Sequence, residues 1–218
     1  MVTLIGMGSG KWEALSAQAQ AAVRGAGLVF GAKRLLAGLP ADCTARQFAL
    51  YQPADILETL AQNPGQDAAV LYSGDTGFYS GASGLLTPLR ALGIPARVYP
   101  GVSSIQLLSA ALGRPWQDWK LVSAHGCACD PVAECMTAGG KPVFFLTGGA
   151  ETPASLCGRL AAAGLGDAHA LVGENLGTPD EKIHFGTAQE LAGQTFASLS
   201  VLLVEHAVHP ERRTPGLP

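Results

Sequence analysis

Several side chains in this sequence have the chemistry to hold or act on a ligand. His125 and Glu174 are titratable groups that could transfer a proton. Asp75 directly follows an apolar run, where its carboxylate could accept a ligand hydroxyl or face a cation, or could instead cap the next helix. Ser103 and Ser104 stand at the start of another helical pattern and have the same two interpretations, ligand contact or helix cap.

A histidine and three cysteines lie close together in the sequence, at His125, Cys127, Cys129 and Cys135. Structural zinc sites separate paired cysteines by two to four residues and need a second pair elsewhere. Here the spacing is tighter and no second pair follows, so we predict no metal site. The odd total of five cysteines indicates reduced thiols in the cytoplasm. The remaining histidines, among them His184, are isolated and expected at the surface.

The chain begins with an apolar run that stops at a glycine-rich segment containing Gly6, Gly8 and Gly10. A dinucleotide site requires the pattern G-x-G-x-x-G, and position 11 is a lysine. No acid ends the second apolar run to hold a ribose, so a nicotinamide or flavin site is not favoured. The segment is either a tight turn without a ligand or a turn that lets a bulky ligand approach the backbone, which glycine permits.

The elements that position these residues alternate between strands and helices. The strands are continuous apolar runs, which is typical of parallel sheets covered on both faces. They form two series, 2–5, 28–30, 68–72 and 96–99, then 119–122, 143–146, 170–172 and 199–204. We therefore expect two α/β domains, 1–113 and 119–207, with a cleft between them. Residues 208–218 form a polar, proline-rich tail that is either a frayed end or a linker from a longer protein.

Composition narrows the classes of function. With 218 residues and 48% hydrophobic content, the chain can bury a core without disulfides or metal. Its net charge of -3 argues against binding nucleic acid. It contains no apolar stretch of about 18 residues and no secretory signal pattern, so we expect neither a membrane span nor export.

Five segments carry a resemblance to a known family when taken together. They are 4–10 (LIGMGSG), 73–79 (SGDTGFY), 99–104 (YPGVSS), 123–126 (SAHG) and 173–177 (GENLG). In this order they resemble the tetrapyrrole methylase family across nearly the whole chain. The last three look like the branch that methylates carbon 5 of a precorrin in cobalamin synthesis. That branch is often fused ahead of a C15-methylating, decarboxylating domain, and the tail looks like such a junction.

The resemblance implies a homodimer with S-adenosylmethionine (SAM) in the cleft and S-adenosylhomocysteine as product. The acceptor would be a corrin precursor, precorrin-7 or cobalt-precorrin-7. The opening loop at Gly8 and Ser9 would face this macrocycle. The implied cofactor contacts are Gly74, Asp75, Gly77, Phe78, Ser103, Ser104, Leu146, Thr147, Asn175 and Leu176.

Two positions depart from the family pattern. Thr76 stands where proline, which would stiffen the loop, is common. Cys127 stands where arginine often follows the Ser-x-His-Gly segment. Any carboxylate contact made by that arginine would have to come from elsewhere, with Arg34 and Arg114 as candidates.

Methyl transfer from a sulfonium to an enamine-type carbon depends mainly on geometry. Holding methyl and carbon about 3 Å apart and excluding water can contribute up to about 7–11 kcal/mol, so a base is optional. His125 and Glu174 could then hold loops rather than move protons. Two alternatives stay open: a family member with another acceptor (a different tetrapyrrole position, a modified histidine or ribosomal RNA), or a non-catalytic module that binds SAM or a corrinoid.

Overall fold

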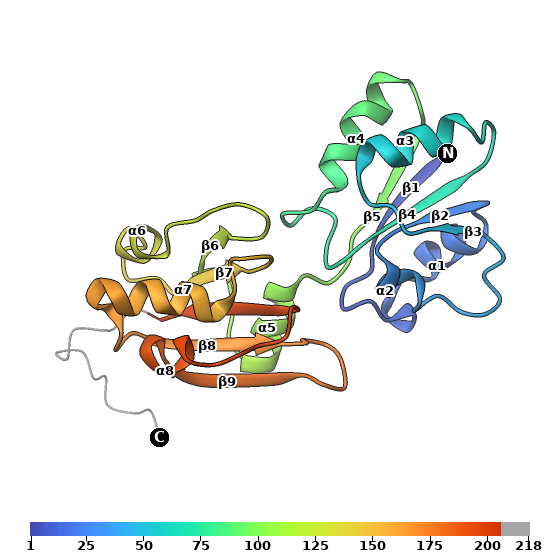
Figure 1. The fold of residues 1–218 in the computed structure, drawn as a ribbon. Helices are drawn as coiled ribbons and strands as arrows, with labels where there is room; N and C mark the ends of the chain where they lie inside the picture. Colours follow the sequence, from blue (N-terminus) through green and yellow to red (C-terminus); the bar gives the residue numbers. More distant parts are fainter. Residues whose placement is uncertain (206–218) are drawn as a thin grey trace. The chain divides into compact units, whose positions relative to one another are not determined.

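The computed structural model describes residues 1–205, which fold into two compact units, each built on a five-stranded sheet (Figure 1). The first unit is Met1–Ser104 and the second starts at Ile105. The division falls after the first residue of α5 (Ser104–Leu112), so nearly the whole helix belongs to the second unit, although the sequence analysis placed it in the first domain. Its buried face explains the difference, because Leu108 packs against Gly173 of the second unit. The predicted tail, 208–218, lies outside the described residues.

The first sheet is entirely parallel, as the continuous apolar runs predicted. Its order is β3-β2-β4-β1-β5. The sequence analysis missed β3, a three-residue edge strand whose side chains are largely exposed. The strands are β1 (Val2–Gly6), β2 (Leu28–Phe30), β3 (Arg46–Phe48), β4 (Ala68–Tyr72) and β5 (Ala96–Tyr99).

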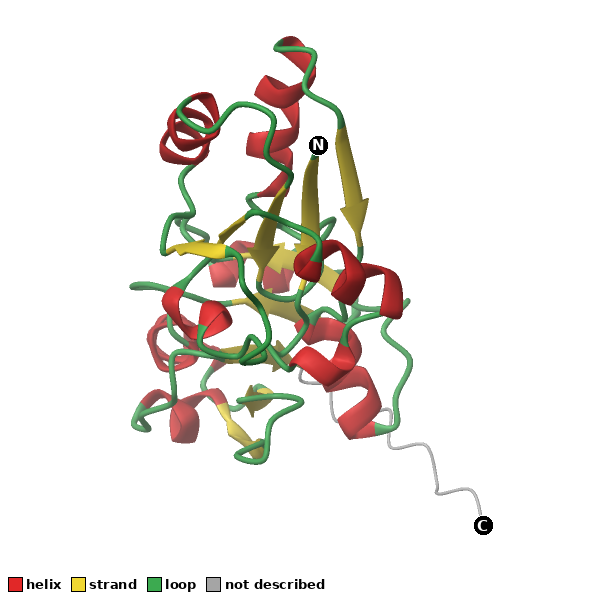
Figure 2. Ribbon diagram, turned by 90° about the vertical axis from the view of Figure 1, so that its right-hand side faces the viewer, coloured by secondary structure: helices red, strands yellow, loops and turns green. Residues whose placement is uncertain are grey.

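Helices cover both faces of this sheet, and alternate residues of β1 enter two different cores (Figure 2). Ile5 packs with a short 3-10 turn (Trp12–Ala14), α1 (Ala17–Arg24) and α2 (Lys33–Leu36). Leu4 packs on the opposite face with α3 (Pro53–Ala61) and α4 (Ala82–Ala91). Burial on both sides makes β1 apolar at consecutive positions, so its sequence shows no alternation.

The second sheet is mixed, which corrects the expectation of a parallel sheet in this half. Its order is β6-β7-β10-β8-β9, and β10 runs antiparallel to both of its neighbours. All five residues of β10 are buried, so its apolar run gave no information about direction. The strands are β6 (Lys120–Ser123), β7 (Val143–Leu146), β8 (His169–Glu174), β9 (Lys182–Thr187) and β10 (Ser200–Val204).

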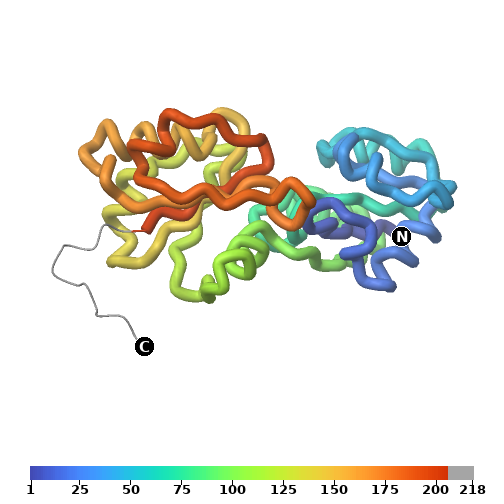
Figure 3. The backbone as a smooth tube through the Cα atoms, turned by 90° about the horizontal axis from the view of Figure 1, so that it is seen from below, coloured from blue at the N-terminus to red at the C-terminus, as the bar shows by residue number. Residues whose placement is uncertain are grey.

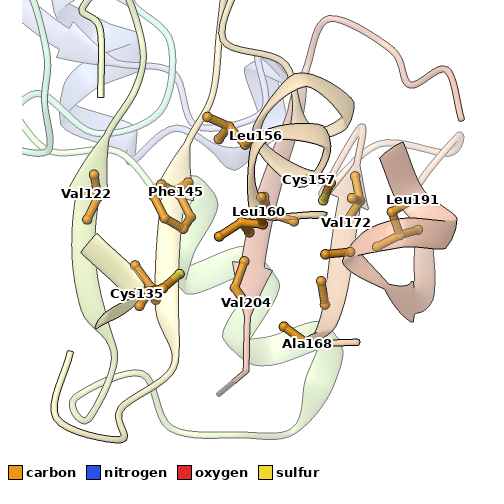
Figure 4. Close-up of a cluster of buried hydrophobic side chains, with 14 of the residues drawn as sticks. Val122, Cys135, Phe145, Leu156, Cys157, Leu160, Ala168, Val172, Leu191 and Val204 are labelled. Atoms are coloured by element: carbon orange, nitrogen blue, oxygen red, sulfur yellow. The ribbon is translucent and has the colours of Figure 1, made fainter. Parts of the chain in front are cut away.

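Three helices and a π-helical turn (Ala161–Leu165) accompany one face of this sheet, and the backbone path through them can be followed in Figure 3. The helices are α6 (Pro131–Met136), α7 (Pro153–Leu160) and α8 (Ala188–Ala192). Figure 4 shows Phe145, Leu160 and Leu191 among the side chains of the core between helices and sheet. No helix within residues 1–205 has the length and hydropathy needed to cross a bilayer.

Candidate functional site

In the first unit, three loops come together where β1, β4 and β5 end. Gly8 and Gly74 exchange two backbone hydrogen bonds of 3.0 and 2.8 Å, which join the loop after β1 to the loop after β4. Gly101 joins the third loop, since its N–H donates to Oδ1 of Asp75 over 3.1 Å. Three of the five segments quoted for the family resemblance (4–10, 73–79 and 99–104) therefore meet at one sheet edge. This is the carboxyl edge, where open α/β sheets bind ligands.

Two glycines let these loops touch through their backbones. A Cβ on Gly101 would lie 2.6 Å from the carbonyl carbon and oxygen of Gly6, and a Cβ on Gly6 would lie 2.5 Å from the Gly101 nitrogen. Real Cβ atoms do not approach backbone so closely. Gly6, the first glycine of the opening segment, is therefore required because its backbone touches that of Gly101. Gly8 differs, because it has φ of 57° and ordinary spacing around it.

Asp75 connects the loops through both carboxylate oxygens. Oδ2 accepts from the Gly77 N–H over 2.9 Å, and Oδ1 accepts from Gly101. The alternative interpretation of Asp75 as a helix cap is wrong, because α4 begins at Ala82 with Gly81 at its N-cap position. Its contact with a ligand stays a prediction.

The other predicted residues of this unit lie at the same edge. Ser103 is 4% exposed and its Cα lies 3.9 Å from the position a Cβ on Gly74 would take. Ser104 is the first residue of α5. Phe78 packs edge to face on Tyr79, with ring centroids 4.8 Å apart, and Tyr79 has a left-handed backbone with φ of 47°. A bulky residue in that conformation is strained, which is common at ligand-binding loops.

In the second unit, β6, β7 and β8 end at one edge, beside the start of β10. Thr147, 5% exposed, follows β7 and donates its hydroxyl to the Ser200 carbonyl over 2.6 Å. The Asn175 N–H donates to the Leu199 carbonyl over 2.8 Å, and Asn175 has φ of 52°. Leu176 is buried against Gly173. The predicted residues of this half, including Leu146, therefore also share one edge.

His125 lies after β6 at this edge and is exposed. Its Nδ1 is 3.1 Å from the Thr147 carbonyl, and that ring nitrogen must carry a proton to donate to a carbonyl. Nε2 is then the atom that can accept a proton in the neutral ring. Gly148 makes the contact possible, because a Cβ there would lie 2.6 Å from Cε1 of His125.

Glu174 holds two segments with its carboxylate. Oε1 accepts from the Ala197 N–H over 2.5 Å, and Oε2 lies 2.8 Å from Nε2 of His184. These hydrogen bonds, first that from Ala197 and then that from His184, lower the pKa of Glu174 below its ordinary value. A lower pKa makes the carboxylate a weaker base, so these contacts favour its interpretation as a residue that fixes loops.

Sequence reasoning missed His184 as part of this edge. Its side chain is 31% exposed rather than fully at the surface, and its ring packs edge to face on Phe196 with centroids 5.3 Å apart. Nothing in the sequence pairs it with Glu174, because the pair depends on the register of β8 with β9.

Arg114 is not a residue of this edge. It forms an ion pair with Glu205, and the N–H of Glu205 donates to the carbonyl of His169 at the start of β8. That is the opposite edge of the sheet from Glu174, which corrects the suggestion of Arg114 as a carboxylate contact at the site. Within residues 1–205, no group of three or more histidine, cysteine or acidic side chains could hold a metal ion.

Comparisons with known proteins agree on one family. The family model of the tetrapyrrole (corrin/porphyrin) methylases matches residues 1–192. The cobalt-precorrin-7 C(5)-methyltransferase of Salmonella typhimurium is 33% identical over 187 residues, which is 85% of this chain and 90% of the relative. The precorrin-6Y C(5,15)-methyltransferase [decarboxylating] of Sinorhizobium sp is 30% identical over 184 residues, 84% of this chain but only 44% of that longer protein.

The fold is also shared with solved structures. The uroporphyrin-III C-methyltransferase of Thermus thermophilus, solved in complex with S-adenosylhomocysteine, superposes with a TM-score of 0.73 at 20% identity. The superposition covers 94% of this chain and 91% of that chain. At this identity the likeness concerns the fold alone.

Proposed function

Because the chain belongs to the tetrapyrrole methylase family, we propose that it is a SAM-dependent methyltransferase that adds a methyl group to carbon 5 of precorrin-7 or cobalt-precorrin-7 in cobalamin biosynthesis. One observation carries the choice of acceptor. The relative named for that reaction is matched over 90% of its own length, so the likeness extends through the whole of that protein.

The precorrin-6Y relatives support a second part of the proposal. The chain spans about half the length of these C(5,15)-methyltransferases. We propose that this chain corresponds to the C5-methylating part of such proteins and can act joined to a C15-methylating, decarboxylating domain. We further propose, from the family resemblance, that the chain acts as a homodimer in the cytoplasm, which sedimentation equilibrium and cell fractionation would test.

The residues present are compatible with SAM. Asp75 uses one acceptor position of each oxygen for backbone N–H groups, and a carboxylate offers about four in all, so it retains capacity for a ribose hydroxyl. At Gly74, with φ of 65°, the nearest atom to an added Cβ is 3.9 Å away, so the backbone there is open to a ligand. Bound SAM would supply a methyl group already activated by its positive sulfur.

The residues of the chain would contribute mainly by holding the cofactor and the acceptor in position. The hydrogen bonds of Asp75, Thr147 and Glu174 fix the loops of the two edges before a ligand arrives, which lowers the entropy lost on binding. We propose that His125 fixes the loop after β6, with Nε2 as the one ring atom able to accept a proton. Glu174, with its lowered pKa, would orient Asn175 and Leu176 toward the cofactor.

The test is transfer of a labelled methyl group. The protein is incubated with SAM labelled in its methyl carbon and with precorrin-7 or cobalt-precorrin-7, and the product is examined by mass spectrometry and NMR. We expect the label on carbon 5 with at least one acceptor, and the preferred acceptor tells the metal-free from the cobalt-containing pathway. Label on another carbon, or none on either acceptor, contradicts the proposal.

Calorimetry with S-adenosylhomocysteine separates the remaining alternatives. A protein that binds this product but transfers no methyl group is a binding module rather than an enzyme. A concentration of about 100 times Kd should raise the unfolding free energy by about 2.7 kcal/mol. NADH serves as the control ligand and should give no protection against unfolding.

A further inference from the structure

Arg34 lies at the carboxyl edge of the first sheet, next to the opening glycine loop. It belongs to α2, and its Nη2 donates to the hydroxyl of Ser73, the residue that follows β4. Its Nη1 lies 3.1 Å from the position that a Cβ on Gly10 would occupy. The guanidinium is therefore held between the loops that follow β1 and β4, two of the three loops that form this edge.

Arg34 shares with Arg46, Arg90 and Arg97 the absence of an acidic partner within residues 1–205. It is distinguished by its place between two loops of the carboxyl edge. Arg24, Arg114 and Arg159 each pair with a carboxylate, whereas no carboxylate within residues 1–205 lies at ion-pair distance from Arg34. Partial burial lowers the pKa of Arg34 from its ordinary value, although the residue is still exposed. A cation that has lost part of its water without gaining a counter-charge is unfavourable, and an anionic ligand would compensate it.

Two lysines close to Arg34 or Gly10 in the sequence also lack acidic partners among residues 1–205. Lys11 follows Gly10 and Lys33 precedes Arg34, and neither lysine forms an ion pair within the described residues. The whole chain carries a net charge of -3, so cations without partners at one edge are not the consequence of a basic composition. Arg34 also remains exposed, so a ligand can reach it.

We propose that Arg34 binds a carboxylate side chain of the tetrapyrrole acceptor and thereby sets the orientation of the macrocycle. The inference rests on the proposed function, because a corrin precursor carries several acetate and propionate side chains. Guanidinium is suited to this role because its planar N–H groups match a carboxylate in a bidentate contact. Ser73 takes one N–H group and fixes the plane, and the other donors stay available.

The proposal predicts a selective loss of acceptor binding. In Arg34→Gln, the Kd for precorrin-7, measured by calorimetry without turnover, should rise roughly ten- to hundred-fold, because a hydrogen bond to a charged group is lost. The Kd for S-adenosylhomocysteine should not change. Arg34→Lys keeps the charge but not the bidentate geometry and should recover only part of the affinity. Arg90→Gln is the matched control, an exposed arginine of the same unit without an ion pair, and should bind as the wild type.

Acceptor analogues with a single carboxylate amidated identify the bound group. One amide should weaken binding to the wild type but not weaken binding to Arg34→Gln any further, since the two changes remove the same contact.

The outcomes separate this inference from the function on which it rests. If the wild type transfers methyl to carbon 5 and Arg34→Gln binds the acceptor as tightly as the wild type, the inference fails and the function stands. Equal losses for acceptor and S-adenosylhomocysteine in both Arg34 variants would also overturn it, since they indicate a general structural role. If the wild type binds no acceptor at all, both proposals fail.

Discussion

Replacing Gly101 by alanine tests the backbone contact on which the first loop cluster depends. Gly101 does not have a positive φ, so the methyl group should act through contacts alone and not through backbone strain. It would lie 2.6 Å from both carbonyl atoms of Gly6 and closer still to the carbonyl oxygen of Gly74. These are backbone atoms next to paired strands, which cannot rotate away as a flexible side chain would.

The cost can be approximated from known effects. Overpacking typically destabilises by about 1–3 kcal/mol, and the rigidity of these neighbours places Gly101→Ala at or above the upper end of that range. Separation of the loops would also break the hydrogen bond from Gly101 to Asp75, worth about 1.5–3 kcal/mol for a charged acceptor. Removing a glycine from the unfolded chain returns only about 0.4–1 kcal/mol. We therefore expect a net loss of about 3 kcal/mol or more.

Urea unfolding followed by circular dichroism measures this loss, and calorimetry shows whether S-adenosylhomocysteine still binds. Gly84→Ala is the matched control in the same unit, because its Cβ would lie in α4 at an ordinary 3.7 Å from Pro53. That variant should gain about 0.5–1 kcal/mol and bind normally. A Gly101→Ala protein as stable as the wild type would refute the close approach of the three loops.

Three further predictions concern the second unit. Because the folded-state pKa of Glu174 is lowered from 4.5, its contribution to stability is present above that value and is lost as the pH falls through the folded pKa; urea unfolding of wild type and Glu174→Gln should therefore converge in acid. Burial raises the pKa of Cys157 to about 12, so a disulfide reagent at about pH 8 should modify the exposed Cys127 and reach Cys157 only after denaturation, with sites identified by peptide mass spectrometry. Gly148→Ala should displace the ring of His125, and nitrogen NMR of that imidazole should lose its preference for a proton on Nδ1.

Much of the fold was predictable because buried strands have a strong sequence signal. β7, for example, has the bounds expected from its apolar run at 143–146. The edge strands β3 and β9 were missed because none of their residues is fully buried, so selection for apolar residues is weak. The helix α8 was also missed, although a signal existed. Thr187 and Glu190 form a capping box, whose spacing of threonine and glutamate can be read directly in the sequence.

The candidate site was predictable in part. The order of its motifs along the chain indicated which loops would carry it, since carboxyl ends of parallel strands meet at one edge. The partners of individual residues were not predictable, because they join distant segments. The Gly6–Gly101 approach, the Glu174–His184 pair and the position of Arg114 each depend on strand order or register.

Glycine-rich loops are often taken as a sign of a ligand, and here the structure separates two kinds of glycine. Gly6 and Gly101 are required because a Cβ on either one would collide with the backbone of the other. Both would be needed even in a protein that binds no ligand. Gly8 and Gly74 have positive φ angles, and no atom lies within 3.4 Å of where their Cβ atoms would be, so protein packing alone does not require the space beside them. Arg34 donates to Ser73 but has no counter-charge within residues 1–205, and a fold gains little from a partly desolvated cation without one. Gly8 and Gly74 are needed for their backbone conformation, but the open space beside them is not explained by protein packing. Features that packing does not explain are the more informative ones about a ligand, and at this edge they are an open backbone and a positive charge without a counter-charge among the described residues.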